Sequence, residues 1–278
     1  MSVRERDLIR TIEYPESDGE PMAETDLHAQ LMIDLRFALR NFFRDDPQTY
    51  VAGNLLMYYV EGDPRKSKAP DVFVARGVSK EPPRKIWKVW EEGKAPDVVI
   101  ELSSRRTWEE DLQKKWRVYE DIGVREYYVF DPWYEYLSRP LLAYRREGGE
   151  FISVAVIEGA VQSNVLGLEL VDTGATLRLR HPQTGEFLPT EEEEVARAEH
   201  EAKRAEREAE RAEREAERAE REAERAEREA ERAEREAVRA EHETERAEHE
   251  AEARATAEAR AERLAARLRE LGVDPDQV

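Results

Sequence analysis

The chain has 278 residues with 45 Lys and Arg against 64 Asp and Glu, so its formal net charge at pH 7 is −19. It contains no Cys, which excludes disulfides, thiolate zinc sites and cysteine nucleophiles and fits a reducing, cytoplasmic setting. No segment approaches the ~18 apolar residues of a membrane span, and the charged N-terminus has no apolar signal-peptide core, so we expect a soluble protein. The acidity argues against a broad electrostatic contact with nucleic acid but leaves room for local basic clusters.

The N-terminal part predicts an extended segment over residues 1–23 and then a helix over 25–44. Apolar residues such as Leu27 and Leu35 recur there at helical spacing. His28 falls on the same apolar arc, and we expect it to be a packed core residue rather than a ligand. Glu24, one turn earlier, is a candidate for an additional acid at a site.

The next segments alternate in a way that predicts a mixed α/β sheet. After the first helix come three strands, a second helix that stops at Gly123 and a fourth strand, so the order is α-β-β-β-α-β. Glycine-rich turns then separate further strands, which we expect to be antiparallel additions. The predicted strands are 50–60, 71–75, 97–102, 125–130, 141–144, 151–157 and 177–180, and Gly53 and Asn54 interrupt the first of them.

The segment from Ala95 to Ile122 contains the least usual pattern. An apolar strand carries Glu101 near its end and leads into a helix for which Thr107 and Glu110 have the spacing of a capping box. On a helical wheel, Lys115 falls inside the apolar arc and the adjacent Lys114 falls on the opposite side. A lysine directed toward the core needs a carboxylate partner or a function.

Asp71, Glu101 and Lys115 therefore form a candidate catalytic set. Two carboxylates from neighbouring strands suit a hard divalent cation, and a nearby ammonium can stabilise charge on a phosphate, so the set matches metal-assisted phosphodiester hydrolysis. A structural ion pair between Glu101 and Lys115 explains the same residues. We expect Asp97 to cap its strand rather than bind metal, and Asp111 to position Lys115.

The sequence also resembles the Uma-two family of restriction-endonuclease-like proteins, in the PD-(D/E)XK superfamily. The matching segments are APDVFV at 69–74, PDVVIELSS at 96–104, Thr107, Asp111, Lys115, YEDIGVREYYVFDP at 119–132 and NVLGLEL at 164–170. The resemblance implies a restriction-endonuclease-like fold, a Mg²⁺ or Mn²⁺ cofactor bound by Asp71 and Glu101, and DNA as the substrate. Ser103 occupies the place where the superfamily usually has its lysine, and the resemblance assigns that role to Lys115.

The C-terminal part differs in composition, so we expect a nuclease domain over 1–190 and a helical or coiled-coil tail over 191–278. The tail repeats Ala at alternating spacings of four and three residues between Glu and Arg, a 3.5-residue period that predicts a left-handed seam with a partner helix. Alanine buries little surface, so this seam is weak. We expect a homo-oligomerisation arm, and the alternative for the tail is an isolated helix. The alternative function of the protein is an inactive nuclease-like protein that binds DNA or acts as a scaffold.

Overall fold

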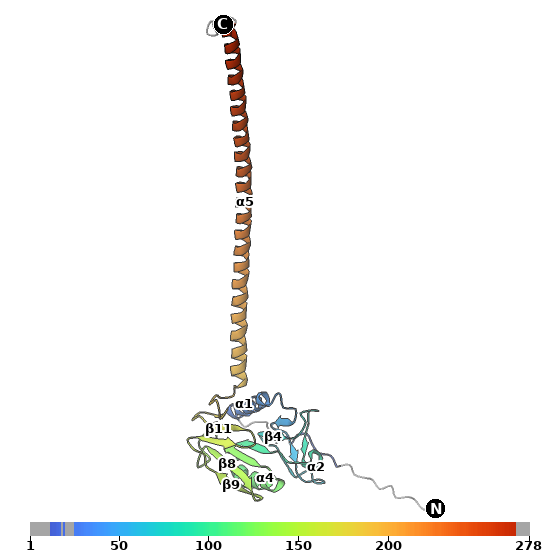
Figure 1. Cartoon of the computed structure of the whole chain (residues 1–278). Coiled ribbons are helices and arrows are strands. Elements are labelled where there is room, and N and C mark those ends of the chain that lie inside the picture. Colours follow the sequence, from blue (N-terminus) through green and yellow to red (C-terminus); the bar gives the residue numbers. More distant parts are fainter. Residues whose placement is uncertain (1–11, 18, 20–24, 271–278) are drawn as a thin grey trace, which may run out of the picture. The chain divides into compact units, whose positions relative to one another are not determined.

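The computed structural model describes residues 12–17, 19 and 25–270, and its elements are labelled in Figure 1. The chain divides into two compact units, one extending through Glu199 and one beginning at His200. In order, the elements are α1 (Asp26–Phe42), β1 (Thr49–Ala52), β2 (Met57–Tyr58), β3 (Ser67–Lys68), β4 (Val72–Arg76), β5 (Trp87–Lys88), α2 (Val89–Glu92), β6 (Val98–Leu102), α3 (Trp108–Glu110), the π-helical turn η1 (Asp111–Lys115), α4 (Trp116–Ile122), β7 (Glu126–Phe130), β8 (Leu141–Glu147), β9 (Glu150–Val154), β10 (Ala160–Ser163), β11 (Leu168–Asp172), β12 (Leu177–Arg180) and α5 (Glu191–Glu270).

The main sheet has the strand order β1-β4-β6-β7-β8-β9. Strands β6 and β7 are parallel, with Leu102 opposite Phe130, because the helical segment between them returns the chain to the starting edge. The other neighbouring pairs are antiparallel. The mixed α/β sheet predicted from the sequence is confirmed, including the antiparallel strands added after β7.

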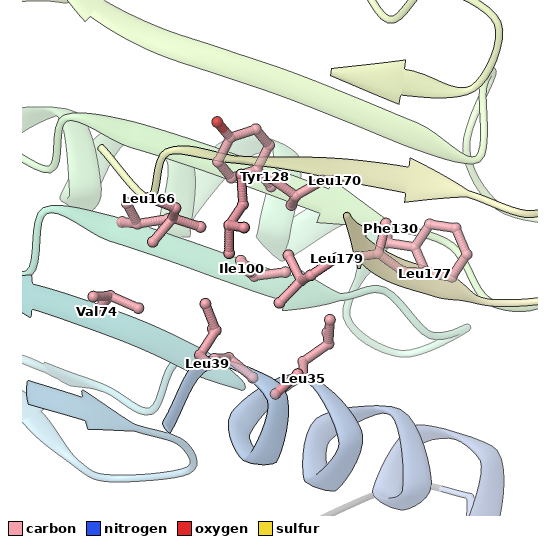
Figure 2. Packing of buried hydrophobic residues seen from close by; sticks show 14 of the residues in the cluster. Leu35, Leu39, Val74, Ile100, Tyr128, Phe130, Leu166, Leu170, Leu177 and Leu179 are labelled. Atoms are coloured by element: carbon pink, nitrogen blue, oxygen red, sulfur yellow. The ribbon is translucent and has the colours of Figure 1, made fainter. Parts of the chain in front are cut away.

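The alternation of side chains along the central strands creates two cores, one on each face of the sheet. On one face, Leu35 and Leu39 of α1 pack toward Val74 and Ile100, as Figure 2 shows, together with residues of β10–β12 such as Leu170. All of these side chains are buried. The sheet is therefore covered on this face by α1 and by the second sheet.

The opposite face packs against α4. Phe73, Val99 and Tyr127 are fully buried there and share a core with Tyr119 of the helix. Because Glu101 is two residues after Val99, its side chain points to this same face. This alternation directs an acidic side chain into the layer between the sheet and the helix.

The predicted strand over 50–60 is wrong in one respect, because it is two strands in different sheets. β1 lies in the main sheet, whereas β2 pairs with β3 and β5. Gly53 and Asn54 separate them, and Asn54 has a left-handed backbone with φ of 50°. A Cβ at Gly53 would lie 2.4 Å from the carbonyl oxygen of Asp71, so only glycine allows this close approach.

Strands β10 and β11 were not predicted, and they form the second sheet with β12. The buried carboxylate of Glu126 joins the two sheets: it accepts hydrogen bonds from the backbone N–H of Asn164 at 2.9 Å, the Ser163 hydroxyl and the Tyr128 hydroxyl. Arg145 lies 3.6 Å from the same carboxylate. The second sheet is thus attached through one buried acid.

Helix α5 has 80 residues and is drawn as one continuous helix in Figure 1. Its surface carries ion pairs in which Glu precedes Arg by four residues, the favourable orientation with respect to the helix dipole. Examples are Glu210–Arg214 at 3.3 Å and Glu231–Arg235 at 3.0 Å. The seam alanines are exposed in the single chain. In the described part of the chain, no helix is both long and apolar enough to cross a membrane.

Replacing Glu126 with Ala is expected to lower the free energy of unfolding by about 3 kcal/mol, because several buried donors lose their acceptor at once. Urea unfolding followed by circular dichroism measures the change. The matched control is Glu147→Ala at the exposed end of β8, for which we expect a change within about 0.5 kcal/mol. Equal stability of the two variants would contradict the role given to Glu126.

Candidate active site

Asp71 and Glu101 lie side by side on neighbouring strands. In the antiparallel register of β4 and β6, Val72 is opposite Ile100, so continuing it by one residue places Asp71 opposite Glu101. The backbone N–H of Asp71 donates to Glu101 Oε2 at 3.4 Å. Glu101 is fully buried, while 13 % of the Asp71 side chain is exposed, so any approach to this pair from solvent is on the Asp71 side.

Lys115, at the end of the π-helical turn η1, reaches back to the strand. Its Nζ lies 2.9 Å from Glu101 Oε2 and 2.9 Å from Asp111 Oδ1. The side chain of Lys115 is 12 % exposed, whereas Lys114 is exposed to solvent, so the orientation expected from the helical wheel agrees with the structure. The ammonium therefore lies between two buried carboxylates and retains a small accessible surface.

Two hydroxyl groups complete the surroundings of these acids. The Ser103 hydroxyl donates to Asp111 Oδ2 at 2.9 Å, and the Tyr119 hydroxyl donates to Glu101 Oε1 at 2.6 Å. Ser103, at the position where the superfamily usually has lysine, thus contacts the acid that holds Lys115. The sequence pattern does not reveal this role of Tyr119, because an aromatic side chain at helical spacing does not show where its hydroxyl points.

His28 is buried, as expected for a core residue, but its ring also contacts the site. Thr25 caps α1 by accepting from the N–H of His28 at 3.2 Å, and the His28 ring Nε2 lies 3.0 Å from Asp71 Oδ1. The other oxygen of Asp71 accepts from the backbone N–H of Leu102 at 2.7 Å. The carboxylate of Asp71 is therefore held from two directions, by α1 and by the end of β6.

Burial has the largest effect on the pKa values of Asp71, Glu101 and Asp111, and the shared ammonium of Lys115 opposes it in each case. Burial raises the pKa of Glu101 to about 8; Lys115 opposes this shift, and the charges of Asp71 and Asp111 add to it. Burial also raises the pKa of Asp111 in spite of Lys115. Burial acts against ionisation of Asp71 too, but the His28 hydrogen bond and the charge of Lys115 keep its pKa below the usual range.

The pKa of Lys115 itself is raised. Burial favours the neutral amine, but the charges of Glu101, Asp111 and Asp71 outweigh it. Lys115 is therefore a permanent cation at neutral pH. It can attract an anionic group but cannot serve as a base.

Other residues singled out in the sequence do not join this cluster. Asp97 lies before the other end of β6, where it accepts from the backbone N–H of Arg76 at 2.7 Å and from Lys94 Nζ at 2.6 Å. The predicted capping box is wrong: the Thr107 side chain makes no cap hydrogen bond, and Glu110 pairs with Lys68. Glu24 lies outside the described residues.

The donor set fits a divalent cation bound by two carboxylates. Among the residues that the structure describes, no three His, Cys, Asp or Glu side chains are grouped so that they could hold a metal ion. Mg²⁺, however, commonly takes only one or two carboxylates and fills its remaining positions with water and phosphate oxygens. The negative charge around Asp71 and Glu101 favours such a cation, because it would act with Lys115 against the burial and the neighbouring acids that raise the pKa of Glu101.

A comparison with protein families gives a match that spans the residues of the candidate site. A family model named Uma2 and described as "Putative restriction endonuclease" matches residues 7–178, a span that includes Asp71, Glu101, Asp111 and Lys115. The chain belongs to the Uma2 family. No curated protein matches this Uma2 chain.

Among solved structures, the Uma2 chain is similar to one described as a "putative nuclease belonging to DUF820" from Anabaena variabilis. The two sequences are 16 % identical, the TM-score is 0.38, and the match covers 51 % of this chain and 74 % of the other.

The raised pKa of Glu101 predicts that the melting temperature falls as the pH rises from about 5 to about 8. A carboxyl group whose pKa is raised on folding contributes stability that is fully present below its unfolded value of 4.5 and is lost as the pH rises through about 8. Asp111 acts in the same direction. Scanning calorimetry in metal-free buffers measures the fall.

Glu101→Gln is expected to flatten this pH dependence, because the amide does not titrate. The control Glu147→Gln, at an exposed site, should leave it unchanged. A melting temperature that rises across the window, or a Glu101→Gln variant with the parent slope, would show that Glu101 is ionised in the metal-free fold.

Proposed function

We propose that this Uma2 protein is a DNA endonuclease that hydrolyses phosphodiester bonds with Mg²⁺ or Mn²⁺. The observation that supports this most directly is the meeting of Asp71, Glu101 and Lys115 in one buried cluster with a partly accessible edge. The family match over the same residues supports it further. A structural ion pair alone would not require a second strand acid at the same point.

Each residue has a role that follows from its contacts. Asp71 and Glu101 would hold the cation, which when bound neutralises charge on a phosphate group. Lys115 keeps Glu101 in place and offers a permanent positive charge to a phosphate oxygen. His28 orients the carboxylate of Asp71, and Asp111 orients Lys115.

The remaining features of the proposal are the domain limits and the setting. We place the nuclease domain at residues 1–190 and the helical tail at 191–278. A cytoplasmic location stays a prediction that rests on the absence of Cys.

The proposal predicts that the purified protein nicks or linearises plasmid DNA with Mg²⁺ or Mn²⁺ and is inactive in EDTA. Asp71→Asn, Glu101→Ala and Lys115→Met are each expected to lower the rate at least about 100-fold, because each removes charge from the site. The matched control is Lys114→Met, which removes the adjacent exposed lysine and should cut at the parent rate.

Circular dichroism of each variant separates loss of activity from loss of fold. If the parent cuts no DNA with either metal, or Glu101→Ala cuts as well as the parent, the protein is not this kind of nuclease.

A second function is an inactive nuclease-like protein that binds DNA and assembles through α5. Two observations favour it: Ser103 stands where the superfamily usually has lysine, and the alanine seam of α5 is exposed. We propose that this seam pairs with the same helix of another copy, in a coiled coil with a 3.5-residue period.

The tail proposal predicts that light scattering of the full chain gives a mass above that of one copy. Ala219→Lys together with Ala226→Lys should reduce that mass to the monomer, because bulky charges then replace methyl groups in the seam. The control is Glu220→Lys with Glu227→Lys, one residue outside the seam, which should leave assembly intact. If the parent chain is a monomer, α5 is not an oligomerisation arm.

A further inference from the structure

The loop that follows β7 leaves the sheet next to the candidate active site. β6 and β7 are parallel neighbours, so their carboxyl ends lie at the same edge, with Ser103 donating its N–H to the Phe130 carbonyl at 2.7 Å. Loops at the carboxyl ends of neighbouring parallel strands commonly form ligand sites in α/β sheets. The post-β7 loop, residues 131–137, starts roughly 10 Å from the strand of Asp71, two strand spacings away.

A single buried acid holds this loop in one conformation. Asp131 is fully buried, and its Oδ2 accepts from the backbone N–H of Glu135 at 2.9 Å, Tyr136 at 2.6 Å and Leu137 at 3.1 Å. Its Oδ1 accepts from the N–H of Trp133 at 3.0 Å. The carboxylate accepts hydrogen bonds that four backbone N–H groups would otherwise donate to water. The loop is therefore ordered before any ligand binds.

The backbone at Tyr134 shows that contacts hold the post-β7 loop in an unfavourable conformation. Its φ of 58° is in the left-handed region, which costs free energy for a residue with a large side chain. The tyrosine hydroxyl donates to Asp172 at 2.5 Å and its ring packs edge-on against Phe130. These contacts offset the strain.

The post-β7 loop leaves the indole of Trp133 exposed, and several exposed arginines lie at the same edge of the sheet. Trp133 is 45 % exposed although its backbone is fixed, and a tryptophan left in water without a partner loses a large apolar burial. Arg105 and Arg106 are exposed in the loop after β6, and Arg139 is exposed just beyond the post-β7 loop. Glu135 and Arg105 are both close enough for their charges to act on the Tyr136 hydroxyl. Exposed aromatic and arginine side chains in this combination are typical of surfaces that bind single nucleic-acid strands.

We propose that the post-β7 loop binds an unpaired nucleobase, which stacks on the Trp133 indole while Arg105 contacts the adjacent phosphate. The inference rests on the proposed nuclease function for the nature of the substrate and adds to it a preference for DNA with unstacked bases near the cut. The rigid loop makes stacking favourable because little side-chain or backbone freedom is lost on binding.

Fluorescence anisotropy with a labelled dT oligonucleotide and a blunt duplex of equal length tests this on the full chain in EDTA, so that binding is measured without metal-dependent cutting. We expect the single strand to bind more tightly than the duplex. Trp133→Ala should weaken single-strand binding by about 5- to 150-fold, since base–aromatic stacking contributes about 1–3 kcal/mol, and Trp133→Phe should retain most of the affinity. Arg105→Gln should reduce the slope of log affinity against log salt by about 1.

The control is Ile157→Ala, which removes another exposed apolar side chain, 70 % accessible, and should bind like the parent. Unchanged single-strand affinity in Trp133→Ala overturns the inference. The inference is also overturned if Trp133→Ala changes the assembly mass in light scattering but leaves the affinity for DNA unchanged. The loop would then be a protein contact.

Failure of the nuclease proposal is distinguishable from failure of this one. A parent that cuts plasmid while Trp133→Ala binds and cuts equally well overturns the stacking site alone. A parent that cuts nothing but loses single-strand binding in Trp133→Ala retains the stacking site and removes the nuclease.

Discussion

The arrangement of this protein depends on one shared ammonium. Lys115 lies 2.9 Å from both Glu101 and Asp111, and together with Asp71 these acids put more negative charge in the protein interior than a single lysine neutralises. Removing ions from water is costly, and mutual attraction repays that cost only in part. The cluster therefore carries an electrostatic strain that a proton on Glu101 relieves and that the proposed divalent cation would relieve. A purely structural ion pair would be balanced.

The main sheet brings these charged residues together in the candidate site. Side-chain alternation directs Asp71 and Glu101 to one face, the antiparallel register of β4 and β6 sets them opposite each other, and the helical segment brings Lys115 back over them. The π-helical turn is where Lys115 and Asp111 both face the strand. Such wide turns are frequent at functional sites. Asp111 and Lys115 are four residues apart, a spacing that places both side chains on one face of a helix.

Much of the fold was predictable because its signals are local. The apolar period of α1, the buried strands β4, β6 and β7, and the stop at Gly123 follow from side-chain patterns and backbone preferences. The interruption at Gly53 and Asn54 was predicted, but the placement of β1 and β2 in different sheets was not, because it depends on the close approach of Gly53 to the Asp71 carbonyl, a contact between distant residues. Strands β10 and β11 were missed because their pairing is visible only once Glu126 attaches the second sheet.

For the candidate site, the sequence alone was enough to predict Asp71, Glu101 and Lys115 as one set. Hydropathy periodicity aims Lys115 inward, and strand alternation aims the two acids to one side. Only the tertiary structure decided the roles of His28, Tyr119 and Ser103, since each depends on a hydroxyl or ring nitrogen meeting a carboxylate from a different element. Periodicity reports the face on which a side chain lies. The hydrogen-bond partner of that side chain depends on how the elements pack against one another. The sequence pattern does not predict the distance between two side chains on different elements.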